Sequence, residues 1–284
     1  MLACAGLGAG VFAAVQATAS NGESSPVAAR THVALKANAA RQANPASAPL
    51  HASPNVVATN VHCGEVLAAS VTLNGDLNCP GNGSALLITK NSINLNLNGF
   101  SITGSGFTDF GVQVTGTSDT VQNGVFRGFN TAVAVSGATD VVTKLRVTNS
   151  ASIGIYDKGT KTKITSNTVS ANQTGILLQG TSPTLTGNRV AGNTSIGIFV
   201  DFAVTAVLTG NFASSNHSDG IFDEGTDTTM TGNTVDFNHV DGIRVSEPTG
   251  AAIDGGTNSA SGNGWDTANG GTGIQCLNIV CVSH

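Results

Sequence analysis

Hydrophobic and polar positions recur along the chain with a period near 22 residues. The clearest mark is a small residue followed by Val or Ile, and successive marks lie 21, 22, 21, 22, 23, 22 and 31 residues apart. A period of this length is typical of a solenoid, in which each repeat packs on its neighbours. The marks are Gly111-Val112, Ala132-Val133, Gly154-Ile155, Gly175-Ile176, Gly197-Ile198, Gly220-Ile221, Gly242-Ile243 and Gly273-Ile274.

Two sets of asparagines repeat in the same register and divide each period further. One set is Asn167, Asn188, Asn211 and Asn233, and the other is Asn172, Asn193, Asn216 and Asn238. Alternating β-branched residues between such marks indicate strands of about four to six residues. Asparagine tolerates left-handed backbone and bonds its own turn, so we expect asparagine ladders between coils about 4.8 Å apart. The pattern predicts an all-β solenoid of about seven or eight coils.

Two recurring motifs resemble the generic repeat of the right-handed parallel β-helix superfamily. T-G-N-x-V units occur at Thr186–Val190 and Thr231–Val235, and N-x-x-D-G-I units at Asn216–Ile221 and Asn238–Ile243. The resemblance covers about residues 60–284 and implies a single-stranded right-handed parallel β-helix. The superfamily includes pectate lyases, polygalacturonases, alginate epimerases and binding proteins without known catalysis, so the resemblance also implies a long sugar chain as partner.

Composition and the N-terminal region limit the partners and the compartment. Charged residues make up 10% of the chain and the net charge is −5, which excludes a basic nucleic-acid surface. Residues 1–19 are expected to be a signal peptide without its basic start, and 20–59 a flexible leader rich in Ala, Pro and Ser. Residues 60–284 then form the β-helix domain. We expect a secreted or periplasmic monomer that does not insert into a membrane.

The cysteines of the β-helix domain lie in two local pairs near its ends. They are Cys63, Cys79, Cys276 and Cys281. Three pairings are possible, and the local one, Cys63–Cys79 with Cys276–Cys281, is the simplest. Their placement predicts caps stapled by disulfides.

Position two after each repeat mark predicts an outward row of side chains. Because the Ile or Val at position one faces the core, its neighbour faces out. The row is Gln113, Ala134, Tyr156, Leu177, Phe199, Phe222 and Arg244. Tyr156, Phe199 and Phe222 are therefore candidate substrate-binding residues, with Trp265 from the long last coil as a fourth. Alternatively, a loop or the leader covers the aromatic row.

Acidic residues gather near the same coils. Asp157 and Asp223 occupy position three, where other coils carry Val or Leu, and Glu224 follows Asp223. If position three faces inward, the two aspartates are buried with a raised pKa. If the strand ends first, they are solvated turn residues, which is the interpretation we favour. Asp223 and Glu224 then join the candidate substrate-binding residues.

A tandem His-x-Asp pattern carries the most specific chemistry. His217 and Asp219 recur as His239 and Asp241 with a spacing of 22 residues, and Arg244 follows. Stacked on successive coils, these five candidate catalytic residues could act as acid, base and carboxylate anchor. A divalent cation held by the His and Asp side chains is an alternative, although no metal-ligand motif is present. N-x-x-D-G is also a common turn in β-helices, which needs no catalytic role.

Two functions of different class follow from these features. One is a lyase or epimerase acting on an acidic polysaccharide. The other is a non-catalytic surface protein that binds a polysaccharide or another partner. The paired Asp-Asp, Gly-His-Gly and Arg-x-Lys elements of polygalacturonases and the Asp-x-His-Glu/Asp unit of alginate epimerases are missing. The sequence therefore leaves enzymatic activity open, with the lyase or epimerase as the first hypothesis and the binding protein as the alternative.

Overall fold

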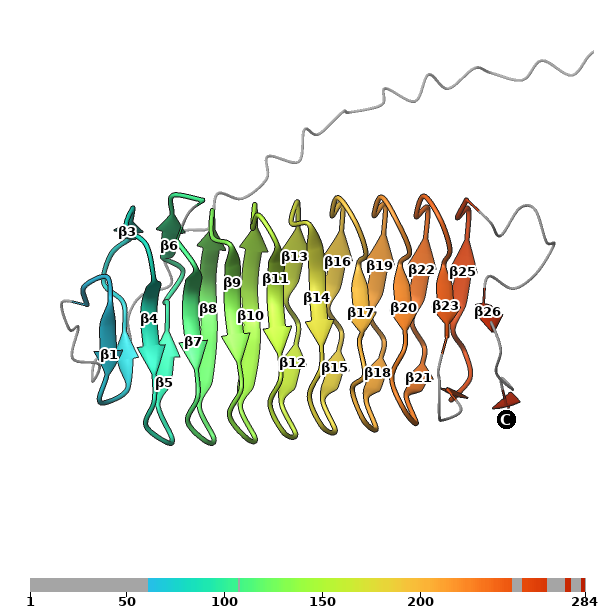
Figure 1. The fold of residues 1–284 in the computed structure, drawn as a ribbon, viewed down its shortest axis with the longest axis horizontal. Helices are drawn as coiled ribbons and strands as arrows, with labels where there is room; N and C mark the ends of the chain where they lie inside the picture. Colours follow the sequence, from blue (N-terminus) through green and yellow to red (C-terminus); the bar gives the residue numbers. More distant parts are fainter. Residues whose placement is uncertain (1–60, 107, 247–251, 265–273, 277–281, 284) are drawn as a thin grey trace, which may run out of the picture. The chain divides into compact units, whose positions relative to one another are not determined.

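The described part of the protein is built from β-strands alone. The computed structural model describes residues 61–106, 108–246, 252–264, 274–276 and 282–283, and its elements run from β1 to β27 (Figure 1). Within these residues there is no helix with the length and apolarity needed to cross a bilayer. The predicted signal peptide and leader lie outside the described residues.

Ten parallel strands form the first sheet, with one strand from each successive coil (Figure 1). Its strands are β1 (Glu65–Leu67), β4 (Ser84–Ile88), β7 (Phe110–Val114), β9 (Thr131–Val135), β11 (Ile153–Asp157), β14 (Thr174–Leu178), β17 (Ile198–Val200), β20 (Ile221–Asp223), β23 (Ile243–Val245) and β26 (Ile274–Cys276). Each pairs in parallel with the strand of the next coil, as Ile176 does with Ile198. The repeat marks of the sequence therefore fall in one sheet.

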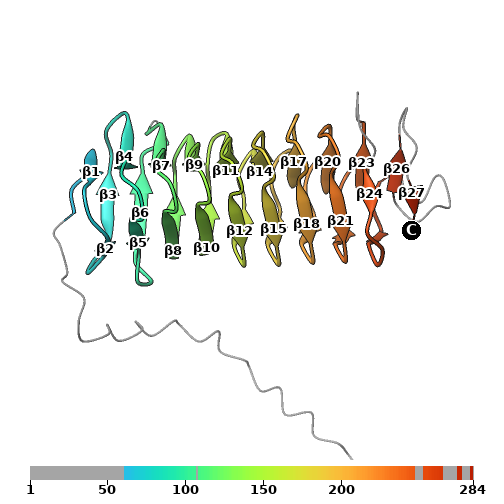
Figure 2. The same ribbon diagram turned by 90° about the horizontal axis from the view of Figure 1, so that it is seen from below.

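Two further rows of strands complete each coil. The second row holds β2 (Val71–Thr72), β5 (Asn94–Asn96), β12 (Lys163–Thr165), β15 (Thr184–Thr186), β18 (Val207–Thr209), β21 (Thr229–Thr231), β24 (Ile253–Asp254) and β27 (Val282–Ser283). The third holds β3 (Leu77–Cys79), β6 (Ser101–Gly104), β13 (Thr168–Ser170), β16 (Arg189–Ala191), β19 (Phe212–Ser214), β22 (Thr234–Asp236) and β25 (Ser259–Ser261). The longer β8 (Thr120–Arg127) and β10 (Val141–Thr148) belong to both rows. Figure 2 shows β12, β15, β18 and β21 side by side along the second row.

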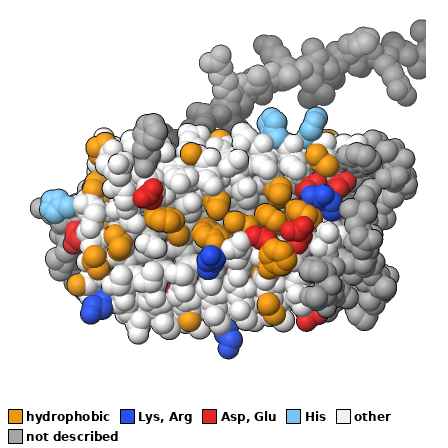
Figure 3. All heavy atoms as spheres, in the orientation of Figure 1, with side chains coloured by type: hydrophobic (Ala, Val, Ile, Leu, Met, Phe, Trp, Pro, Cys, Tyr) orange, Lys and Arg blue, Asp and Glu red, His pale blue; other side chains and the backbone are white. Residues whose placement is uncertain are grey.

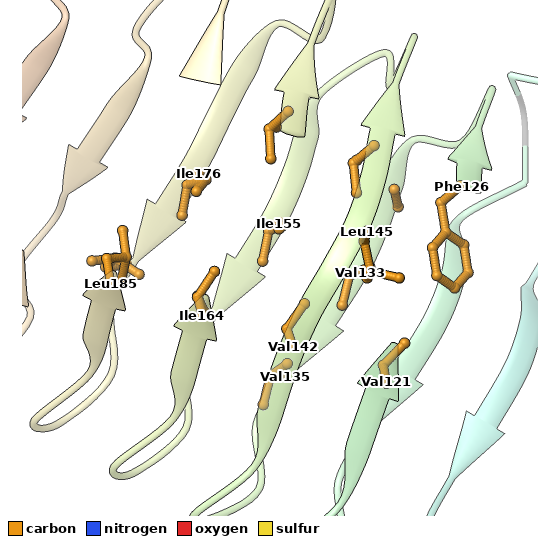
Figure 4. Close-up of a cluster of buried hydrophobic side chains, with 14 of the residues drawn as sticks. Val121, Phe126, Val133, Val135, Val142, Leu145, Ile155, Ile164, Ile176 and Leu185 are labelled. Carbon is orange, nitrogen blue, oxygen red and sulfur yellow. The ribbon is translucent and has the colours of Figure 1, made fainter. Parts of the chain in front are cut away.

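The core consists of inward side chains stacked from coil to coil. Val133, Ile155 and Ile176 are fully buried in the first sheet and meet inward residues of the other rows, such as Ile164 and Leu185 (Figure 4). In β11 and β14 the glycine before this position is buried as well, so two consecutive residues face inward. A side chain at Gly175 would collide with the Val190 side chain and the Gly197 carbonyl, which explains the repeated glycine.

Both predicted asparagine ladders are present and connect consecutive coils. In the first, the backbone N–H and side-chain amide of Asn167 donate to Oδ1 of Asn188, each at 3.0 Å. Asn188 donates in the same way to Asn211, and the pattern continues through Asn233 to Asn258. The second ladder contains Asn172, Asn193, Asn216, Asn238 and Asn263. Buried amides that bond in this way satisfy turn groups that water cannot reach.

The fold confirms the solenoid and corrects its length. The ten-stranded first sheet corresponds to about nine turns, against the seven or eight coils predicted. The predicted number was too low because β1 and β4 precede the first repeat mark and lack its sequence signal. Part of the extra length of the last coil precedes Asn258. Asn233 and Asn258 are 25 residues apart, against 22 for Asn211 and Asn233.

One predicted disulfide lies in the described part of the chain. Cys63 and Cys79 are bonded, with an S–S distance of 2.08 Å and Cα atoms 5.5 Å apart. The disulfide joins the segment just before β1 to the end of β3 in the third row, and so closes the N-terminal coil covalently. The expected pair Cys276–Cys281 stays a prediction, because Cys281 lies outside the described residues.

Candidate functional site

The outward row of the first sheet forms as the alternation predicts. Tyr156 lies between Ala134 and Leu177 across the strands, and Phe199 lies beside Phe222. We call the residues Leu87, Gln113, Ala134, Tyr156, Leu177, Phe199, Phe222 and Arg244 the outer row. Figure 3 shows a band of hydrophobic side chains running across the coils on the face that it presents. The row provides a mostly apolar strip along the axis of the solenoid.

Phe199, Phe222 and Arg244 form a stack at the C-terminal end of the outer row. The two rings are nearly parallel, with an interplanar angle of 4° and centroids 5.0 Å apart. The Cζ atom of Arg244 lies 3.8 Å from the centroid of Phe222, which is a cation–π contact. Phe222 is buried between its neighbours, whereas Phe199 is half-buried. The stack therefore offers ring edges and the outer part of Phe199 to a ligand.

Arg244 also pairs with both aspartates of the tandem pattern. Its Nη2 atom lies 2.8 Å from Oδ2 of Asp219, and its Nε atom 3.9 Å from Oδ2 of Asp241. Asp219 is 0% exposed, and its Oδ1 atom accepts a hydrogen bond of 3.0 Å from the backbone N–H of Asp241. The predicted stacking of Asp219 with Asp241 is therefore present. However, the carboxylate of Asp219 is engaged by Arg244 and closed to solvent.

His217 and His239 occupy a separate pocket at the turn before the first sheet. The pocket has a volume of about 420 Å³ and is lined by Ser215, Asn216, His217, Phe237, Asn238, His239, Gly262 and Gly264. Both imidazoles are exposed. Nδ1 of His217 lies 3.3 Å from the backbone carbonyl of Asn193. We call this cavity the turn pocket. The structure thus divides the five candidate catalytic residues between an exposed His pair and a largely buried Arg–Asp cluster.

A chain of polar side chains borders the outer row. The hydroxyl of Tyr156 donates to Oε1 of Gln179 at 2.6 Å, and Nε2 of Gln179 donates to a carboxylate oxygen of Asp201. Glu224 follows in register on the next coil and is half-buried. Lys158 lies over the ring of Tyr156, with Nζ 5.5 Å from the centroid. Acceptor oxygens therefore run parallel to the apolar strip.

Asp157 and Asp223 are buried, so their interpretation as solvated turn residues was wrong. The strands β11 and β20 continue through them, and position three faces inward as it does for Val200. Burial raises the pKa of Asp157, while hydrogen bonds from Thr162 and Gly159 oppose the rise. Oδ1 of Asp223 accepts from Gly225 N–H and from the Thr228 hydroxyl, both at 3.0 Å. Asp223 is thus a turn-stabilising group closed to solvent, and we no longer propose it as a substrate contact.

Two further buried acids and one exposed aromatic residue escaped the sequence analysis. Asp119 and Asp140 are each 1% exposed and stabilise a turn, because Oδ1 of Asp140 accepts from Asp119 N–H at 2.8 Å. Burial raises the pKa of Asp140 to about 6. Phe237 lines the turn pocket at a register position where other coils carry Gly192, Ser215 or Gly262. A bulky aromatic residue at a position where neighbouring coils carry small residues was the available signal. The candidate Trp265 lies outside the described residues.

Comparisons with solved structures find the same fold in a phage tailspike domain, an alginate epimerase and an alginate lyase. The enzymatically active domain of tailspike protein 2 from bacteriophage CBA120 is 14% identical, with a TM-score of 0.53 over 76% of this chain and 41% of that one. The periplasmic alginate epimerase AlgG is 11% identical, with a TM-score of 0.52 over 77% and 59%. An alginate lyase from Paenibacillus sp. str. FPU-7 is 13% identical, with a TM-score of 0.50 over 77% and 90%. The chain spans less than two thirds of the tailspike and epimerase chains, and these likenesses establish the fold alone.

Two family profiles match the chain, whereas no curated protein sequence does. The profile described as right handed beta helix region matches residues 131–279. The profile described as periplasmic copper-binding protein (NosD) matches residues 55–203. Each covers just over half of the 284 residues. The chain therefore belongs to the right-handed β-helix family and, over its first coils, to the family described as NosD.

Proposed function

We propose that this protein binds a polysaccharide along the outer row of the first sheet. The observation that supports this most is the pairing of two parallel strips, one apolar and one rich in acceptors. Leu177 and Phe199 form part of the first, and Gln179, Asp201 and Glu224 lie along the second. A sugar chain has apolar ring faces and hydroxyl edges, so it can contact both strips at once. Carboxylates accept strong hydrogen bonds from hydroxyl groups.

The charges around the Phe199–Phe222 stack favour a neutral polymer over an acidic one. Asp201, Glu224, Asp219 and Asp241 border the stack, against the single guanidinium of Arg244, which is already paired. A polyuronate would bring further negative charge to this surface, where nearby carboxylates repel it. We therefore expect neutral glycans to bind more tightly than polyuronates at low salt, which departs from the acidic substrate that the sequence suggested.

We assign no lyase or epimerase chemistry to the five candidate catalytic residues. A base must reach the proton that it removes, but Asp219 is fully buried and bonded to Arg244. His217 and His239 face the turn pocket rather than the Arg–Asp cluster. The non-catalytic alternative fits this separation better.

Copper binding, which the second family description names, finds no suitable donor set among the described residues of the matched segment. Among its described residues the one histidine is His62, and Cys63 and Cys79 are consumed by the disulfide. No group of three His, Cys, Asp or Glu side chains in the described part of the chain could hold a metal ion. Copper prefers sulfur and imidazole ligands, so we propose no copper site on these coils.

We further propose an extracytoplasmic location. The Cys63–Cys79 disulfide is typical of oxidising compartments. The word periplasmic in the NosD description and in the name of the AlgG neighbour agrees with it.

Affinity gel electrophoresis tests the binding function. The neutral probes are dextran, soluble xylan and β-glucan, and the acidic probes are polymannuronate, polyguluronate and polygalacturonate. Phe199→Ala should weaken binding of the best probe about tenfold, since it removes roughly 1–3 kcal/mol of apolar contact. Phe212→Ala is the matched control, because Phe212 is a half-buried Phe in the third row, against Arg189.

Three outcomes overturn the proposal. The first is that no probe retards the protein, and the second is that Phe212→Ala weakens binding as much as Phe199→Ala. The third is that the protein releases unsaturated product from a polyuronate and loses this activity in the His239→Ala/Asp241→Ala double variant, which would establish a lyase instead.

A further inference from the structure

We infer that the turn pocket is a second carbohydrate subsite, in which Phe237 stacks on a pyranose ring and His217 and His239 bond its hydroxyl groups. This inference rests on the proposed polysaccharide function and adds to it a place where one sugar unit is held. The pocket adjoins the first sheet, since Asp219 and Asp241 follow the two histidines by two residues each. A polymer on the outer row can therefore reach it.

Phe237 has no evident role in the fold. It is 67% exposed and adopts a positive φ of 57°. The equivalent residues Gly192 and Gly262 have φ values of 65°, where glycine fits without strain. Positive φ is the usual turn conformation in this solenoid, since Ala171 and Ser215 adopt it at the same register with values of 56° and 55°. The exposure and the position of Phe237, rather than backbone strain, therefore set it apart. Phe237 is an exposed ring that lines the turn pocket together with His217 and His239, and this placement is what favours contact with a ligand.

The neighbouring coil leaves space for the ring. A side chain at Gly262 would lie 2.7 Å from the Cδ1 and Cε1 atoms of Phe237, so the glycine on the next coil is what allows the ring to lie there. Unlike Phe222, which is buried between Phe199 and Arg244, Phe237 retains most of its surface. It is the more suitable residue for stacking on a sugar.

The imidazoles are the main side-chain polar groups that remain for a ligand in this pocket. The side-chain amides of Asn216 and Asn238 already donate within the asparagine ladder and to backbone carbonyls. Nδ1 of His217 lies 3.3 Å from Asn193 O, so Nε2 is the ring nitrogen that remains for a ligand. His239 holds the same register, because its backbone N–H bonds Asn216 O at 2.9 Å as that of His217 bonds Asn193 O at 2.9 Å.

These features identify the ligand class. One apolar ring beside two imidazoles matches a pyranose, which has an apolar face and a hydroxyl edge. The volume of about 420 Å³ lies within the range of about 300–1,000 Å³ that is usual for small-ligand clefts. A metal ion would use the histidines and leave the exposed Phe237 unexplained. Among the described residues no third His, Cys, Asp or Glu joins them as a ligand.

Phe237→Gly separates binding from folding. Because glycine relieves the positive φ, the melting temperature should be equal to or above that of the unmodified protein. Binding of the best probe from the panel above should weaken about tenfold. Ala171→Gly is the matched control, since Ala171 occupies the same register with a φ of 56° and lies outside the pocket. It should give the same thermal response with unchanged binding. His217→Ala/His239→Ala should weaken binding like Phe237→Gly.

The outcomes distinguish this inference from the proposed function. If Phe199→Ala weakens binding and Phe237→Gly does not, the subsite is overturned and the outer row stands. If Phe237→Gly weakens binding and Phe199→Ala does not, the turn pocket is supported as a subsite and binding along the outer row is overturned. A lower melting temperature for Phe237→Gly would make Phe237 a structural residue and overturn the subsite. A metal site would also overturn the subsite. It would appear as saturable NiCl₂ binding by calorimetry that is lost in His217→Ala/His239→Ala while that variant still binds the glycan normally.

Discussion

Arg244 lies over the ring of Phe222, with its Cζ atom 3.8 Å from the ring centroid. The same guanidinium pairs at 2.8 Å with Asp219, whose carboxylate is fully buried. Replacing Arg244 by Met would keep an apolar contact with Phe222 but leave the buried charge unpaired. We expect the free energy of unfolding to fall by about 2–3 kcal/mol, less than for a fully buried pair because the Arg244 side chain is 31% exposed.

A double-mutant cycle in urea measures this coupling. Asp219→Asn/Arg244→Met removes the uncompensated charge and should recover part of the loss. Additive effects of the two single changes would show that the ion pair contributes nothing to stability.

The buried Asp140 should make stability depend on pH. Burial raises its pKa from the usual 3.8 to about 6, so the folded chain holds this proton more tightly than the unfolded chain. The resulting stabilisation, at most about 3 kcal/mol, is fully present below about pH 4 and is lost as the pH rises through about 6. Chemical denaturation at intervals from pH 4 to pH 8 should show this decline.

Asp140→Asn provides the comparison for that experiment. It cannot titrate, and its side-chain oxygen can still accept from Asp119 N–H, so the decline with pH should become smaller. The buried Asp119 and Asp157, whose pKa values are also raised by burial, keep part of the effect. An unchanged pH profile in this variant would contradict the assignment to Asp140.

Breaking one asparagine ladder should cost more than any surface change. Asn188→Ala leaves two N–H donors of Asn167 and the carbonyl of Ile164 without their partner, all in the interior. We expect a loss of about 3 kcal/mol or more. The exposed Asn74→Ala is the control and should change stability by less than about 0.5 kcal/mol. Thermal or urea unfolding of the two variants is the measurement.

The Cys63–Cys79 disulfide should protect the N-terminal end of the solenoid. It closes a loop of 16 residues, for which the entropic contribution is about 3 kcal/mol. Relative to the unmodified protein, the Cys63→Ser/Cys79→Ser variant should show faster hydrogen exchange. The acceleration should be larger for the backbone amides of β1 and β4 than for those of β14 or β17. Uniform acceleration along all coils would instead indicate that the coils unfold as one unit.

The sequence was sufficient to predict the parts of the fold that repeat. Asn188 stacks on Asn167 and Asn211, and Phe199 lies beside Phe222, because equal spacing places equivalent residues on top of one another. The predicted domain of residues 60–284 included the first coils, but their number was underestimated because Leu67 and Ile88 fill the core there without the Gly-Ile mark.

The candidate site was harder to predict because it depends on where the alternation is interrupted. Gly220 and Ile221 both face inward, so the register of Asp219 relative to the core could not be obtained by counting from Ile221. As a result, Asp219 is buried against Arg244 while His217 lies exposed on the preceding turn. Asp157 was misjudged for a related reason, since nothing in the sequence fixes the residue at which β11 ends.

The asparagine ladders have a direction, which bears on how such a protein changes its length. Each side-chain amide donates to Oδ1 of the asparagine in the following coil, from Asn167 to Asn258. A duplicated unit of one whole period would present the acceptor and donor that its neighbours need, wherever it is inserted. Gain of a few residues is accommodated in the turns, since both ladders continue across steps of 25 residues, from Asn233 to Asn258 and from Asn238 to Asn263. The molecule is therefore modular, and the solenoid can lengthen by duplication of single coils without redesign of the core.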